Sequence, residues 1–175
     1  GPAVTAMIGA LMHRGPDESG IHEAAGSVLG ATRLAIRGLA GGHQPIIDAA
    51  TGVTVVCNGE IDNSGELRAW LESRGRRVAL PTDVAVLTGL YLEKGGRFVE
   101  DLVGAFAIGL WDPREGLLLL ARDRAGERPL FFCTEGGTVR FATEIADRQP
   151  GVGHHAERLF GRLGADGNRF GGAME

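Results

Sequence analysis

The order of short apolar runs along the 175-residue chain is the feature that most limits its fold. Residues 3–12 place their apolar side chains at helical spacing. Strand-like runs come next, at 27–31, 33–36, 46–48 and 53–57. Two helical stretches follow, and strand-like runs then return, at 105–111, 117–122, 130–134 and 139–142. Strands grouped on both sides of helices, rather than alternating with them, favour antiparallel sheets in an α+β domain.

The two central helices have recognisable ends. Asn63 and Glu66 form a capping-box pattern at the start of the first helix, and Gly75 suits its C-terminal end. The second helix is predicted to open at Thr82 or Asp83.

The spacing of these elements predicts one domain and a tail. We expect the domain to cover residues 3–148. Residues 149–175 are Gly-rich and have little periodicity apart from 156–163, so we expect a loosely ordered tail with at most one short helix.

Composition and charge exclude several classes of function. The formal net charge is −4, which argues against a nucleic-acid-binding surface or a basic face for membranes. No apolar run approaches the 18 residues of a membrane-spanning helix, and no signal peptide is recognisable. We therefore expect a cytoplasmic protein with no membrane or nucleic-acid partner.

The two cysteines, Cys57 and Cys133, lie in apolar strand-like runs and are expected to be buried free thiols. Cys57 precedes Asn58-Gly59-Glu60, so a nucleophile is the alternative. A buried thiol is favoured because no neighbouring His or Lys would lower its pKa, and Glu60 would raise it. The pair at 154–155 is expected to be solvent-exposed, and we expect no metal site.

Polar groups at strand ends suggest a binding site for a free amino acid. The side chain of Asn58 and the backbone N–H of Gly59 could form an oxyanion hole. Arg33, Glu60 and Asp83 carry the charges that would hold an α-carboxylate and an ammonium group. From the residues alone, ordinary turn and N-cap roles are an equally good interpretation.

These groups lie within seven blocks that resemble, in order, the class II glutamine amidotransferases of the asparagine synthetase B branch. The blocks are HRGPDESG at 13–20, RLAI at 33–36 with GHQP at 42–45, NGEIDN at 58–63 with ELR at 66–68, TD at 82–83, GAFA at 104–107 with WD at 111–112, ARDRAGERPL at 121–130 and FATEI at 141–145. The resemblance covers residues 3–147.

The resemblance implies a fold and a function. The fold is the four-layer αββα sandwich of the N-terminal-nucleophile (Ntn) hydrolases. The function is hydrolysis of glutamine, with the ammonia passing to an ATP-using synthetase domain. By position, Arg33 resembles the residue that holds the α-carboxylate of glutamine, Asn58 and Gly59 the oxyanion hole, and Glu60 and Asp83 the partners of the amino group. No cofactor is implied here, because ATP and Mg²⁺ would belong to the synthetase domain, which this sequence lacks.

Departures from the family pattern bear on activity. Family members begin at a Cys whose thiol attacks the amide while its free amine acts as base. That Cys would precede the block at 13–20 by about two dozen residues, and here twelve residues do. Thr5 is internal and lacks the free amine. We therefore expect no glutaminase activity from this sequence. Further departures are Asp62, Arg37-Gly38 and Val84-Ala85.

Two functions remain open. The first is an amidotransferase domain that works with a synthetase domain. The second is a non-catalytic scaffold or interaction domain, as in relatives of the β-lactam synthetase kind. Because the nucleophile strand of the resembled fold is paired inside a sheet, its absence predicts open strand edges and self-association.

Overall fold

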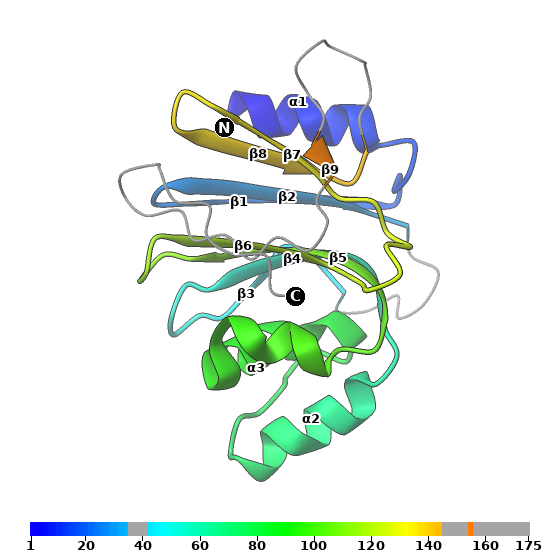
Figure 1. The fold of residues 1–175 in the computed structure, drawn as a ribbon, viewed down its shortest axis with the longest axis vertical. Coiled ribbons are helices and arrows are strands. Elements are labelled where there is room, and N and C mark those ends of the chain that lie inside the picture. The colour runs from blue at the N-terminus through cyan, green and yellow to red at the C-terminus, as the bar shows by residue number, and fades with distance from the viewer. Residues whose placement is uncertain (35–41, 145–153, 156–175) are drawn as a thin grey trace.

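The computed structural model describes residues 1–34, residues 42–144 and the backbone of 154–155. Four layers follow one another in it (Figure 1). They are helix α1 (Pro2–Leu11), a layer of two small sheets, a four-stranded sheet, and the helices α2 (Ser64–Ser73) and α3 (Val86–Lys94). The expected α+β architecture, with antiparallel sheets between helices, is confirmed.

The four-stranded sheet is the centre of the fold. Its strands, in the order β3-β4-β5-β6 and all antiparallel, are β3 (Ile46–Ile47), β4 (Thr54–Ile61), β5 (Gly104–Asp112) and β6 (Leu117–Arg122). The longest ladder joins β4 and β5 and runs from the pair Thr54–Trp111 to the pair Ile61–Gly104.

Successive side chains along these strands point to opposite faces of the sheet, so a separate hydrophobic core forms on each face. Val55, Ile108 and Leu119 pack toward the helices, among Leu71, Leu87 and Leu90. The residues that alternate with the helix-facing ones pack on the opposite face, against the second sheet layer. They include Val56, Ala107, Trp111 and Leu120.

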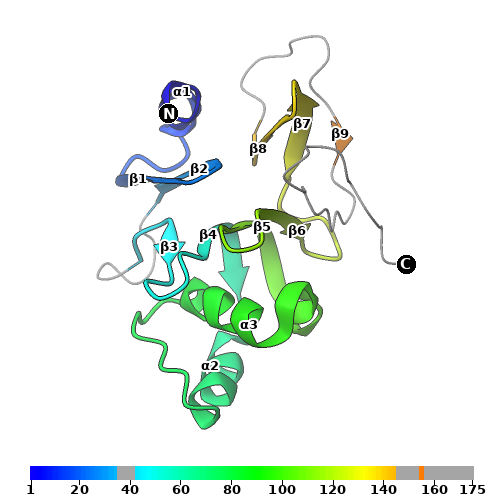
Figure 2. The ribbon, with the colours of Figure 1, turned by 90° about the vertical axis from the view of Figure 1, so that its left-hand side faces the viewer.

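The second sheet layer consists of two separate parts, which Figure 2 shows side by side above the central sheet. One part pairs β1 (Glu18–Ala24) with β2 (Ser27–Arg33). The other has the order β8-β7-β9, from β8 (Thr138–Ala142), β7 (Phe131–Glu135) and β9 (His154–His155). Each of β2 and β8 therefore pairs with a described strand along one edge only.

Several predictions about single elements need correction. Strand β1 (Glu18–Ala24) was not predicted, because its residues alternate between half-buried and exposed and form no apolar run. Arg33 ends β2 instead of starting another strand, and residues 35–36 of that predicted strand lie outside the described residues. Cys133 is half-buried rather than buried.

The predicted capping box at the start of α2 is wrong. The side chain of Asn63 makes no cap hydrogen bond. Its amide instead donates to the carbonyl of Asp101 at 2.9 Å and accepts from the N–H of Val103 at 3.0 Å. Asn63 therefore joins α2 to the end of the 3₁₀ helix η2 (Gly95–Asp101), just before β5.

The second helical segment begins at Asp83, one of the two predicted positions, but as a 3₁₀ turn, and the α-helix itself begins at Val86. A single 3₁₀ turn, η1 (Asp83–Ala85), leads directly into α3, and Gly95 ends α3 with φ 61°. In the described part of the chain, no helix is long and apolar enough to cross a membrane.

Asp123 fixes the turn that leaves the central sheet after β6. Its carboxylate is 5% exposed and accepts N–H bonds from Phe106 at 3.2 Å, Glu127 at 2.9 Å and Arg128 at 3.1 Å. Burial alone would raise the pKa of Asp123, but these backbone N–H groups outweigh it and hold the pKa below its usual value. The ionised carboxylate is therefore the form that supports the fold.

We expect Asp123→Asn to lower the free energy of unfolding by about 1–3 kcal/mol at pH 7, because one strong acceptor serves three buried donors. A lowered folded-state pKa contributes stability above the unfolded value of about 3.9 and loses it as the pH falls through the folded value. The gap between the wild type and Asp123→Asn should therefore close below about pH 4 in urea titrations. Glu72→Gln, an exposed change on α2, is the control. A gap that stays constant with pH would contradict this role.

Candidate functional site

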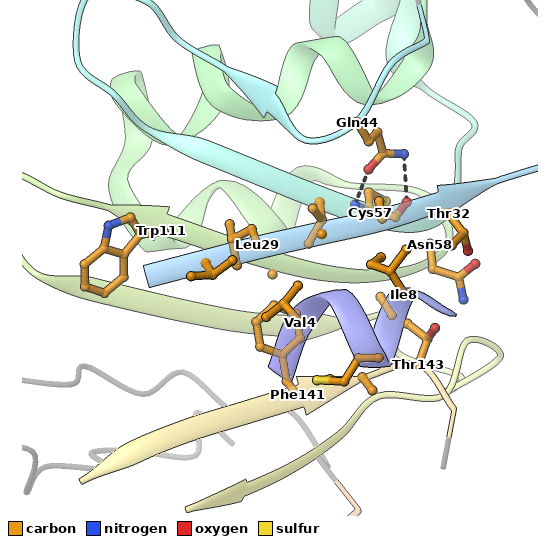
Figure 3. Close-up of a pocket in the computed structure, with 18 of the residues that line it drawn as sticks. Val4, Ile8, Leu29, Thr32, Gln44, Cys57, Asn58, Trp111, Phe141 and Thr143 are labelled. Atoms are coloured by element: carbon orange, nitrogen blue, oxygen red, sulfur yellow. Dashed lines mark hydrogen bonds between the residues drawn. The ribbon is translucent and has the colours of Figure 1, made fainter. Parts of the chain in front are cut away.

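A cleft of about 1580 Å³ lies between the central sheet, α1 and the two parts of the second sheet layer. Figure 3 shows Val4 and Ile8 of α1 on one side of it, with Leu29 and Phe141 between its two ends. Asn58 and Thr143 lie toward one end, and Trp111 lies at the other. The middle of the cleft is therefore apolar, and its ends carry polar groups.

The alternation of β4 decides which side chains reach this cleft. Cys57 belongs to the helix-facing core with Val55, whereas Val56 belongs to the core on the cleft side. Asn58 follows Cys57 and so shares the cleft side with Val56. Its Nδ2 atom is buried and has no hydrogen-bond partner in the structure.

The backbone N–H of Gly59 lies on the open edge of β4, beyond the short β3. On this edge the amide of Gln44 pairs with the backbone of Cys57, accepting its N–H at 2.7 Å and donating to its carbonyl at 3.0 Å (Figure 3). Two positions further on from Gly59, the N–H of Ile61 donates to Asp83 Oδ2 at 2.8 Å. Alternate residues of a strand point their N–H groups to the same edge. The N–H of Gly59 therefore points to this edge, between the Gln44 side chain at Cys57 and the Asp83 side chain at Ile61.

Glycine is required at position 59 by both conformation and space. Its φ of 132° disfavours other residues, and an added Cβ would lie 2.0 Å from the carbonyl oxygen of Ala105. A side chain here would break the β4–β5 ladder beside Asn58.

Arg33 reaches the cleft from the end of β2. Its guanidinium lies 3.6 Å from Glu18, its cross-strand neighbour, and the side chain is 17% exposed. An added Cβ at Gly42 would lie 2.4 Å from that guanidinium, so glycine at 42 leaves the space that Arg33 occupies. Glu18 also contacts His43.

Asp83 and Thr82 are held in place by Arg68 of α2. The guanidinium of Arg68 donates to the carbonyls of Val78, Leu80 and Thr82 at 2.8, 2.9 and 3.0 Å. These three bonds fix the segment that leads into η1, and so place the Asp83 carboxylate against β4.

The five predicted site residues all line this one cleft: Arg33, Asn58, Gly59, Glu60 and Asp83. Glu60 is the exposed member of the set. The arrangement brings a guanidinium, two carboxylates and two N–H donors to one site. Their roles toward a ligand remain predictions.

Four buried side-chain polar atoms of the described residues have no hydrogen-bond partner: Asn58 Nδ2, Thr82 Oγ1, Trp111 Nε1 and Arg128 Nε. All four residues line the cleft. Buried polar groups are nearly always paired, so each of these atoms is an unfilled bonding position in the cleft wall, with Asn58 and Trp111 at opposite ends of the cleft. Of the four, the sequence pointed to Asn58 alone, because an unpaired atom is visible only in three dimensions.

Cys57 is unsuited to attack a substrate. Burial raises the pKa of its thiol far above the ordinary value, and the charge of Asp83 adds to the rise. Both cysteines are free, as expected. Thr5 is exposed on α1 and does not line the cleft. Within the described residues, no group of three His, Cys, Asp or Glu side chains could hold a metal ion.

A family model described as a glutamine amidotransferase domain matches residues 1–156. The chain belongs to this family. It is 37% identical over 141 residues to asparagine synthetase [glutamine-hydrolyzing] 3 of Bacillus subtilis (strain 168), covering 79% of this chain and 23% of the relative. It is also 37% identical over 136 residues to asparagine synthetase B [glutamine-hydrolyzing] of Escherichia coli (strain K12), covering 77% and 24%. The amidotransferase chain thus spans about a quarter of these relatives.

A solved structure supports the fold assignment. The glutamine phosphoribosylpyrophosphate amidotransferase of B. subtilis matches with a TM-score of 0.67 at 19% identity, covering 94% of this chain and 45% of that one. At that identity the likeness concerns the fold alone. The Ntn-hydrolase-like sandwich implied by the sequence is therefore confirmed.

We expect Arg68→Ala to loosen the segment before η1 without unfolding the domain. Each lost bond to a charged donor is worth about 1.5–3 kcal/mol, so Asp83 should no longer hold the N–H of Ile61 firmly. Hydrogen exchange at Ile61 should become at least about tenfold faster. Arg77→Ala, in the same segment and exposed, should leave that exchange unchanged. Unaltered protection of Ile61 in Arg68→Ala would refute this positioning role.

Proposed function

We propose that the cleft binds L-glutamine, as the glutamine-recognising domain of an asparagine-synthetase-like protein. The observation that carries the proposal is the buried, unpartnered Asn58 Nδ2 in the same cleft that Arg33, Glu60 and Asp83 line. Membership of the glutamine amidotransferase family supports glutamine as the ligand of that cleft.

The charges of the site fit the groups of a free amino acid. The α-carboxylate would bind Arg33, and the ammonium group would bind Glu60 and Asp83. The side-chain carbonyl of glutamine would then accept bonds from Asn58 Nδ2 and the N–H of Gly59. These donors are suited to an oxyanion, because they are fixed by the β4 ladder before any ligand arrives.

Hydrolysis also needs a nucleophile that attacks the amide carbon and expels ammonia. Among the described residues, the site offers no activated thiol, since the Cys57 thiol faces the helix-side core with a strongly raised pKa. We therefore propose that residues 1–175 recognise glutamine without hydrolysing it. Transfer of ammonia to an acceptor, with ATP and Mg²⁺, would belong to a synthetase domain, and no cofactor is proposed for this domain.

Calorimetric titration should detect L-glutamine binding at millimolar concentration, with no ammonia released above background. Arg33→Ala and Asn58→Ala should each weaken binding by about 10–100-fold, the worth of one charge-assisted or buried hydrogen bond. Glu72→Gln, remote from the cleft, is the matched control. The proposal would be contradicted if no binding is detected, or if both variants bind glutamine with the affinity of the wild type. Ammonia release that Asn58→Ala abolishes would show that the domain is a working glutaminase.

A second candidate function, as an interaction domain, is favoured by the open strand edges. The second edges of β2 and β8 pair with no other described strand, and both strands line the same apolar cleft. Such edges invite pairing with another chain, so we propose that the isolated domain self-associates. Light scattering at micromolar concentration should give a mass above the 18.4 kDa of one chain. A monomer mass at every concentration would refute self-association.

A further inference from the structure

Arg128 lines the cleft, and the proposed glutamine site leaves it without a role. Its backbone is fixed on one side by the bond from its N–H to Asp123 Oδ2 at 3.1 Å. On the other side Leu130, 1% exposed, anchors the chain in the cleft-side core. The side chain therefore extends from a rigid turn.

The guanidinium of Arg128 has no acid partner among the described residues. Its Nε is buried and makes no hydrogen bond. Arg33, another arginine that lines the cleft, differs because Glu18 lies 3.6 Å from it. A partly buried guanidinium without a partner is costly, so it implies a binding partner that the described residues do not supply.

Arg128 acts on the same part of β4 that carries the oxyanion donors. Its positive charge lowers the pKa of the Cys57 thiol, offsetting part of the larger rise caused by burial and by Asp83. Cys57 directly precedes Asn58 and Gly59. Asp123 Oδ2 accepts the N–H of Phe106 at 3.2 Å as well as the N–H of Arg128 at 3.1 Å, and Phe106 is the ladder partner of Gly59. The turn that carries Arg128 therefore lies beside the strand segment that presents Asn58 Nδ2 and the N–H of Gly59.

These three groups are all donors, and one of them is charged. A neutral amide brings a single acceptor oxygen and an NH₂ group that would meet further donors. A carboxylate brings two acceptor oxygens and the negative charge that a guanidinium binds best. The remaining acids of the site, Glu60 and Asp83, are then left for the ammonium group of the ligand.

We propose that Arg128 binds the distal carboxylate of a dicarboxylic amino acid, so that the cleft holds L-glutamate more tightly than L-glutamine. The inference rests on the proposed function, because it uses the same cleft and the same placement of the α-amino acid group. It adds a specificity-determining residue outside the five predicted ones.

Calorimetric titrations of the whole chain with L-glutamate and L-glutamine test the proposal. The wild type should bind glutamate at least about tenfold more tightly, the worth of one charge-assisted pair. Arg128→Gln keeps a polar side chain with a hydrogen-bond donor but removes the charge. It should lower the affinity for glutamate at least tenfold and the affinity for glutamine less than threefold. Arg128→Lys should restore part of the preference. Arg124→Gln, exposed in the same turn and outside the cleft, should change neither affinity.

Three results would overturn the inference. The first is a wild type that prefers glutamine, and the second is a preference for glutamate that Arg128→Gln and Arg128→Lys both leave intact. In either case, glutamine binding that still depends on Arg33 and Asn58 keeps the proposed function and removes the role of Arg128 alone. The third is the absence of binding by either amino acid at millimolar concentration, which removes both.

Discussion

The antiparallel ladder between β4 and β5 is the interaction on which the rest of the site depends. It fixes the direction of every side chain along β4, and so turns Asn58 toward the cleft and Cys57 toward the helices. It also leaves one edge of β4 open beyond β3, where the N–H of Gly59 lies between the Gln44 and Asp83 caps. A shift of one residue in this register would exchange the roles of Asn58 and Cys57.

Segments far apart in sequence serve this ladder by closing its edge and holding its neighbours. The side-chain amide of Gln44 makes the two hydrogen bonds that a neighbouring strand would make. It accepts the N–H of Cys57 and donates to the carbonyl of Cys57. Arg68 holds the chain that delivers Asp83 to Ile61. These hydrogen bonds cap β4 on both sides of Gly59, so the open position at Gly59 is built by the fold.

Much of the fold could be predicted from the sequence because its cues are local. Apolar spacing located α1, α2, α3 and the central strands, with β6 matching its predicted range of 117–122. Strand β1 was missed because its polar, half-exposed residues carry no apolar run. Asn63 looked like a cap, but its partners Asp101 and Val103 are about 40 residues away, so only tertiary structure assigns its bonds.

The candidate site was predictable in its residue types but not in its geometry. Asn58-Gly59 stood out because the pair offers two donors, one from a side chain and one from a backbone that a ligand can approach closely. No local pattern could show that Arg128 and Thr82 have buried atoms without partners, since that depends on every neighbour in space. The sequence did favour a buried thiol at Cys57, but only the register of β4 shows that the thiol lies in the helix-side core.

The central claim is that an amino-acid ligand completes the open position of β4. Amide NMR spectra recorded during titration with L-glutamine test it most directly, by following the backbone N–H of Gly59 and the side-chain NH₂ of Asn58. The account predicts that both signals shift with one common saturation curve, while the N–H of Cys57, already bonded to Gln44, moves much less. Shifts confined to residues outside the cleft, with Gly59 and Asn58 unmoved at saturation, would contradict it.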